Sequence, residues 1–134
     1  MSQQQRPTVG LKTIYVTLAS EALDPLVAFY QGLLEISPQA HVPGRYAEFV
    51  LPALKLALFK PSARHSQVFS GPASSMSLCL EVDSLVDAIA TLTHLGYPPL
   101  GEIIHASHGQ EIYGYDPAGN RLILHQSSPA NPSD

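Results

Sequence analysis

The stretch that decides the fold is YGYDPAGNRLILHQ, residues 113–126, close to the end of the 134-residue chain. Its middle, DPAGN at 116–120, has the composition of a tight turn, and apolar residues alternate with others on both sides of it. A three-residue loop with Gly119 in the left-handed conformation fits this composition. The stretch therefore predicts a β-hairpin.

The turn also fixes which residues face each other, provided that the loop is three residues long. Counting outward from it gives the pairs of this hairpin, and the same count through LPAL at 51–54 gives those of a second hairpin. The predicted pairs are Tyr113–Ile123, Glu111–His125, Glu48–Ala57 and Tyr46–Phe59.

The hairpin ends a pattern that occurs twice: a strand, a helix and three further strands. Unit one spans about 11–60 and unit two about 76–126. A connector rich in Ser, Pro and Gly separates them at 61–75, and a polar tail follows at 127–134. We expect one domain over residues 1–134, of the α+β class, in which two tandem βαβββ units form a curled mixed sheet around one cleft.

Both helices have recognisable starts. Asp24 is expected to cap the first helix, with Pro25 as its first residue. Ser84 with Asp87 resembles a capping box that opens the second helix. The segment 38–44, which contains two prolines and a glycine, is expected to be irregular.

The composition excludes several classes of protein. A net charge of −4 and a pI near 5.8 argue against a nucleic-acid partner, and no run of Lys or Arg suggests an anionic membrane. The lone cysteine, Cys79, cannot form an intrachain disulfide, and the polar start MSQQQRPTVG is not a secretion signal. We expect a soluble, cytoplasmic protein.

Three stretches resemble the vicinal oxygen chelate superfamily, which includes glyoxalase I, bleomycin-resistance proteins and extradiol dioxygenases. They are YVTLASEALDPLVAFYQGLLEI at 15–36, LCLEVDSLVDAIATLTHLGY at 78–97 and the hairpin at 113–126. Together with the segments between them they cover about 110 residues in the expected order. The resemblance implies that each βαβββ unit forms half a barrel and that the two halves enclose a cleft.

Enzymes of that superfamily bind a divalent metal through about four residues on the first and last strands of the units. The positions of this chain that align with them hold Tyr15, Ala57, Ser77 and Ile123. None of these is a customary ligand for such an ion. We therefore expect no metal and no other cofactor.

Alternation places the remaining candidates on the strand faces turned away from the helices. The predicted ligand-binding residues are Tyr15, Thr17, Tyr46, Glu48, Ser77, Cys79, Glu111, Tyr113, Ile123 and His125. His125 with Glu111 could form a general base and its orienting carboxylate, or only a cross-strand polar pair. Glu48 could replace a lost metal ligand or be a solvated carboxylate. Cys79 fits a small strand residue better than a nucleophile, because no Lys or Arg flanks it.

Three classes of function remain open. The first is a metal-free protein that binds a small organic molecule, as bleomycin-resistance proteins do. The second is an enzyme of lyase, isomerase or dioxygenase type that uses unusual metal ligands or metal-free acid–base chemistry, and the third is an interaction module. The loss of all four usual metal-ligand positions argues against the second class, so we lean against enzymatic activity. An aromatic, partly acidic cleft favours the first class over the third. We also expect a homodimer, because a small curled sheet leaves edges that need cover.

Overall fold

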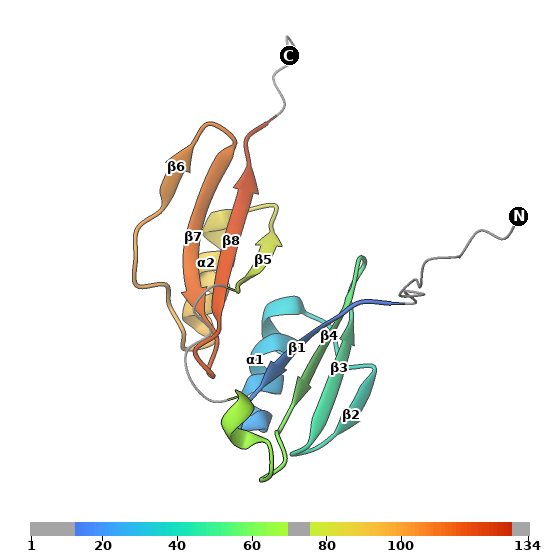
Figure 1. Ribbon diagram of the computed structural model, residues 1–134. Helices are drawn as coiled ribbons and strands as arrows, with labels where there is room; N and C mark the ends of the chain where they lie inside the picture. The colour runs from blue at the N-terminus through green and yellow to red at the C-terminus, as the bar shows by residue number, and fades with distance from the viewer. Residues whose placement is uncertain (1–12, 70–75, 130–134) are drawn as a thin grey trace, which may run out of the picture.

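The computed structural model describes residues 13–69 and 76–129 (Figure 1). Residues 11 and 12 of the expected first strand, connector residues 70–75 and tail residues 130–134 lie outside this range. Within the described ranges, no helix has the length and apolar character needed to cross a membrane.

Unit one is a helix packed on a four-stranded sheet. Its elements are β1 Tyr15–Ala19, α1 Leu23–Leu34, β2 Ala40–Val42, β3 Tyr46–Val50 and β4 Lys55–Phe59. The strand order is β1-β4-β3-β2, with β1 parallel to β4 and the other pairs antiparallel. A short 3-10 helix, η1 Ser66–Phe69, follows, and the Phe69 ring meets Phe59 edge-on at 5.0 Å.

Unit two repeats this arrangement. Its elements are β5 Leu78–Glu81, α2 Leu85–His94, β6 Ile104–Ala106, β7 Gly109–Tyr115 and β8 Arg121–Ser127. The strand order β5-β8-β7-β6 matches that of unit one, with β5 parallel to β8. The α+β class and the two βαβββ units are thereby confirmed.

The strands form two sheets, one per unit, where the sequence suggested one continuous curled sheet. β1 and β5 are both edge strands, and they do not pair with each other in the described part of the chain. In Figure 1 each helix lies behind its own sheet, which leaves the other face of both sheets uncovered by helix.

The core lies between each helix and its sheet. Alternate strand residues point into it, because successive side chains of a strand project to opposite faces. The largest fully buried side chains are Tyr30, Phe49, Leu26, Leu56, Leu58, Leu85, Leu92, Leu122 and Leu124. They come from both units and belong to one buried cluster, so the two halves share a core.

A buried hydrogen bond joins the units. The Tyr30 hydroxyl of α1 donates to Asp116 Oδ2 in the β7–β8 turn at 2.7 Å. Asp116 also accepts from the backbone N–H groups of Ala118 and Asn120 and from Asn120 Nδ2, each at 2.9 Å. Burial, reinforced by the Asp116 carboxylate, raises the pKa of Tyr30 far above its ordinary value. The turn aspartate thus anchors the hairpin locally and binds it to the helix of the other unit.

Apolar contacts extend this joint. The Phe29 ring meets Tyr97 edge-on with ring centroids 5.4 Å apart. Gly32 lies so close to Leu95 that an added Cβ would be 2.6 Å from Leu95 Cδ2. Gly32 therefore allows α1 to approach the end of α2 closely.

The start of α1 differs from the expectation. The helix begins at Leu23 with Ala22 at the N-cap, and no side chain caps it. Asp24 lies inside the first turn, where its carboxylate accepts a hydrogen bond from the Gly44 backbone N–H at 3.0 Å. The proposed Asp24 cap was wrong because Asp24 bonds the β2–β3 turn instead.

Two other local expectations had different outcomes. The Ser84 cap is confirmed, since its Oγ accepts from the Asp87 N–H at 3.1 Å. The segment 38–44 is not wholly irregular, because β2 pairs with β3 across a turn in which Gly44 has a φ of 76°. Three residues are too few for alternation to reveal such a strand.

Candidate functional site

The candidate site residues lie on the face of each sheet turned away from its helix, called here the open face. All four predicted pairs are confirmed: Tyr113–Ile123, Glu111–His125, Glu48–Ala57 and Tyr46–Phe59. The parallel strands add Thr17 beside Ala57 and Cys79 beside Ile123. Since paired residues share a face, the turn-based register placed these side chains correctly.

The structure brings the ten predicted residues together as two groups. Tyr15, Thr17, Tyr46 and Glu48 lie on the open face of unit one. Cys79, Glu111, Tyr113, Ile123 and His125 lie on that of unit two, with Ser77 just before β5. Ser77 Oγ accepts a hydrogen bond from Arg121 Nε at 2.7 Å. The two groups belong to separate sheets.

A small polar cluster occupies the open face of unit one. Glu48 accepts a hydrogen bond from the Tyr46 hydroxyl at 2.8 Å, and Lys55 Nζ lies 3.8 Å from its other oxygen. The ammonium of Lys55 also lies 5.4 Å from the centroid of the Tyr15 ring. Burial, with the neighbouring Glu48 carboxylate, raises the pKa of Tyr46 to about 12. Lys55 was missed, although alternation with Ala57 would have placed it on this face.

His125 is held by a different carboxylate from the one expected. Its Nδ1 lies 2.7 Å from Glu81 Oε1, while Ser127 donates to Glu81 Oε2 from its backbone N–H and its hydroxyl. The hydrogen bond from His125 is the main cause that lowers the pKa of Glu81. Glu111 lies across the strand pair but is not the orienting group, which corrects that part of the prediction.

The second nitrogen of His125 is enclosed. Its Nε2 is buried and has no hydrogen-bond partner in the part of the chain that the structure describes. The Gly109 backbone is so close that an added Cβ would lie 3.1 Å from this nitrogen. The His108 ring lies 5.2 Å from the His125 ring, between centroids. Neither ring nitrogen is therefore presented to a substrate, and this geometry does not support a general base at His125.

Cys79 has the properties of an unreactive thiol. Burial raises its pKa, and the nearby carboxylates of Glu111 and Glu81 raise it further. Because the thiolate is the nucleophilic form, this environment opposes a nucleophilic role.

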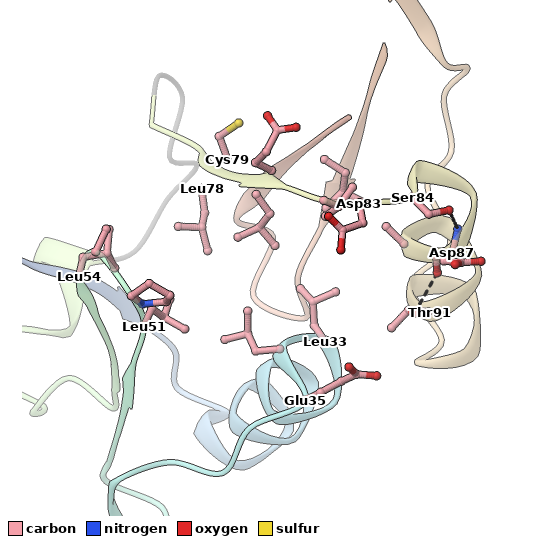
Figure 2. Close-up of a pocket in the computed structure, with 18 residues that line it drawn as sticks. Leu33, Glu35, Leu51, Leu54, Leu78, Cys79, Asp83, Ser84, Asp87 and Thr91 are labelled. Atoms are coloured by element: carbon pink, nitrogen blue, oxygen red, sulfur yellow. Dashed lines mark hydrogen bonds between the residues drawn. The ribbon is translucent and has the colours of Figure 1, made fainter. Parts of the chain in front are cut away.

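A cavity of about 770 Å³ lies elsewhere, between the two units (Figure 2). It is lined by the end of α1, the β3–β4 turn, β5 and the start of α2. Of the ten predicted residues only Cys79 lines it, and in Figure 2 its side chain points away from Leu33 and Leu51. The cavity is thus distinct from the open faces. Sequence reasoning missed it because segments of both units, mostly turns and helix ends, form its wall.

Known proteins resemble this chain in structure. No protein-family model and no curated protein matches its sequence. A glyoxalase-related enzyme from Fulvimarina pelagi is 18% identical with a TM-score of 0.70, and the match covers 90% of this chain and 93% of that one. A glyoxalase/bleomycin resistance protein from Albidiferax ferrireducens T118 is 18% identical with a TM-score of 0.69, covering 85% and 97%. A lactoylglutathione lyase from Agrobacterium tumefaciens is 21% identical with a TM-score of 0.66, covering 90% and 95%.

The chain has the vicinal oxygen chelate fold. Sequence identities this low establish the fold alone, because activity depends on the residues of the site.

The residues of this chain do not fit the metal that the vicinal oxygen chelate fold implies. The aligned positions hold Tyr15, Ala57, Ser77 and Ile123, and Ala57 is 3% exposed. Alanine and isoleucine have no donor atom in the side chain, and neutral hydroxyls bind zinc, iron or nickel weakly. Within residues 13–69 and 76–129, no group of three or more His, Cys, Asp or Glu side chains is arranged to hold an ion.

Proposed function

We propose that the protein binds a small, carbon-rich organic molecule on its open faces and that it does so without a divalent metal. The observation that carries the proposal is the exposure of three tyrosines on strands or strand ends. Tyr15, Tyr113 and Tyr115 are 42%, 43% and 48% exposed on faces that bear no helix. Aromatic rings presented in this way can stack on a planar ligand.

Polar groups on the same faces could orient such a ligand. Lys55 and Glu48 form a charged pair beside Tyr15, and Glu111 lies next to Tyr113 on the β7 face. A few polar groups among apolar and aromatic surface are typical of small-molecule sites. In this proposal unit one supplies the Tyr15 ring, a cation and a carboxylate, and unit two supplies two rings and a carboxylate.

The alternative is an enzyme of the same fold that uses unusual ligands or metal-free acid–base chemistry. Glu48, Glu111 and His125 are the groups that such an enzyme would use. His125 Nε2 is buried, and its Nδ1 is hydrogen-bonded to Glu81. Neither nitrogen is available to a substrate or an ion, so we favour ligand binding over this alternative.

We also infer a homodimer in which a second copy completes the binding site. The open faces carry further exposed apolar side chains, Val42, Val50 and Ile104, which are 52%, 45% and 40% exposed. β1 and β5 are edge strands, and an uncovered edge favours pairing with another chain. A sheet from the partner could turn an open face into an enclosed cleft.

Binding can be tested through tyrosine fluorescence, because the chain has six tyrosines and no tryptophan. Native mass spectrometry of the purified protein would first show any retained organic molecule. Planar heteroaromatic compounds would then be titrated. Bleomycin is included because the chain resembles the glyoxalase/bleomycin resistance protein from Albidiferax ferrireducens. We expect quenching that saturates, and we expect Tyr113→Ala to abolish it.

Val86→Ala is the matched control, since Val86 is 72% exposed on α2 and away from the open faces. Equal binding by both variants would contradict the proposal. For the metal-free state, the protein would be exposed to zinc, nickel, manganese and iron(II), and loosely held ions would be removed. One retained ion per chain, lost in Glu48→Ala or His125→Ala, would instead establish the unusual-ligand alternative.

A further inference from the structure

The cavity between the units has two chemically different ends. In Figure 2 Leu51, Leu54 and Leu78 converge on one side, while Asp83, Ser84 and Asp87 lie on the other. The leucines are half-buried, so each leaves apolar surface toward the cavity. Removing such surface from water favours the binding of an apolar group.

The charged side chains that line the cavity are all negative. Its ionisable residues other than Cys79 are carboxylates, namely Glu35, Glu81, Asp83 and Asp87, and no Lys, Arg or His is among the lining residues. Glu81 is bonded to His125 and Ser127, which leaves Glu35, Asp83 and Asp87. In the described part of the chain none of these three is in an ion pair.

The ends of the two helices do not offset this charge. The N-terminus of α2 carries a partial positive charge, but three of its first four N–H groups already have acceptors within the chain. The Gln126 side chain accepts from the N–H of Leu85, and Ser84 accepts from those of Asp87 and Ala88. The C-terminus of α1 carries a partial negative charge, and its last turn has no basic residue. The C-cap residue of α1, Glu35, borders the cavity.

From this geometry we propose that the cavity binds an organic cation with an apolar body, such as a protonated amine on an aromatic or alkyl group. The apolar body lies against Leu51, Leu54 and Leu78, and the cationic group lies toward Asp83 and Asp87. The volume of about 770 Å³ lies within the range of small-molecule sites. This site is on the opposite side of β5 from the open face, and it does not depend on the function proposed above.

Three compounds with one carbon skeleton separate charge from apolar contact: 4-phenylbutylamine, 4-phenylbutanol and 4-phenylbutyrate. Their affinities for the full chain would be measured by calorimetry at low salt. We expect one amine per chain, bound about fivefold more tightly than the alcohol and weakened by salt, with the acid weakest. Equal affinity for amine and alcohol, or preference for the acid, would overturn the proposal.

Variants locate the site. Asp83→Asn and Asp87→Asn should each weaken the amine about twofold and leave the alcohol unchanged. Glu102→Gln makes the same charge change at an exposed residue that does not line the cavity, so it should alter neither. Tyr113→Ala, on the open face, should also leave amine binding intact. If Tyr113→Ala alone abolished it, the cation would belong to the open face and the proposal would be wrong.

A second copy of the chain is the competing occupant. Leu54→Lys places a positive charge in the cavity wall, so it should abolish amine binding without changing the mass in solution. If the amine does not bind the wild-type chain, the proposal is wrong. If Leu54→Lys converts a dimer to a monomer, the cavity is an interface and the proposal fails.

Discussion

Asp116 accepts four hydrogen bonds, and the one from Tyr30 comes from the other unit. A buried carboxylate with this many partners is costly to remove, since each donor left unpaired loses its bond without regaining water. We expect Asp116→Ala to lower the free energy of unfolding by about 3 kcal/mol or more, and Tyr30→Phe by about 1–2 kcal/mol. Urea unfolding of both single variants and the double variant measures this. Additive losses would show that the two side chains are not coupled.

Glu81 makes stability depend on pH. The pKa of Glu81 is lowered in the folded chain, chiefly by the hydrogen bond from His125. In the unfolded chain the pKa of a glutamate is about 4.3. Because the pKa of Glu81 is lower in the folded chain, its ionised form stabilises the fold above about pH 4.3. This stabilisation is lost as the pH falls through the pKa of the folded chain. We therefore expect the wild-type chain to be more stable than Glu81→Gln at pH 7, with the difference closing below about pH 4. A difference that is constant down to pH 3 would contradict this assignment.

At the scale of the element, the alternation in β8 separates core from open face. Leu124 is fully buried, whereas Ile123 beside it is half-buried on the open face. We expect Leu124→Ala to cost about 2–5 kcal/mol of stability and Ile123→Ala clearly less. Thermal and urea unfolding of the two variants would reveal any error in the register. The reverse order would mean that β8 presents its other face to α2.

The start of β7 requires a glycine. Gly109 has a φ of 150°, and a Cβ there would collide with the backbone oxygen of Gln126 in β8. Gly119 also has a positive φ, 84°, but has open space around it. We expect Gly119→Ala to cost about 1 kcal/mol from backbone strain alone. Gly109→Ala should cost more, because the strands must also separate; equal losses in thermal unfolding would argue against that clash.

The elements show why some features could be predicted and others not. The pairs across both hairpins followed from turn length, because a turn of known length fixes every pair beyond it. The start of α1 did not follow, since Asp24 has a tertiary partner, Gly44, that no local pattern reveals. Glu81 was missed as the partner of His125 for a similar reason, because β5 reaches β8 only through the parallel pairing.

At the scale of the whole molecule, alternation assigned residues to faces but could not say how the two faces are placed. That placement depends on contacts between units, such as Phe29 with Tyr97 and Gly32 with Leu95. Neither contact has a sequence pattern of its own. For this reason the cavity between the units was not anticipated.

The quaternary structure is a further expectation at this scale. The two open faces and the edge strands β1 and β5 leave backbone and apolar groups that a second copy could cover. We expect sedimentation equilibrium at micromolar concentration to give twice the 14.4 kDa mass of one chain. Replacing Thr17 in β1 by proline removes an edge N–H group and should shift the mass toward one chain. A wild-type mass of one chain would contradict the homodimer.

The hydrogen bond between Tyr30 and Asp116 has a consequence for how the chain reaches its native state. The two residues are 86 positions apart, whereas the hairpin contacts of each unit are local. Closing so long a loop is slow compared with forming a hairpin, although its entropic cost grows only with the logarithm of loop length. We therefore expect each half to assemble early and the docking of the halves to come late. In such an undocked chain Tyr30 and the aspartate of the turn would be hydrated, and the leucines of both helices would be open to self-association.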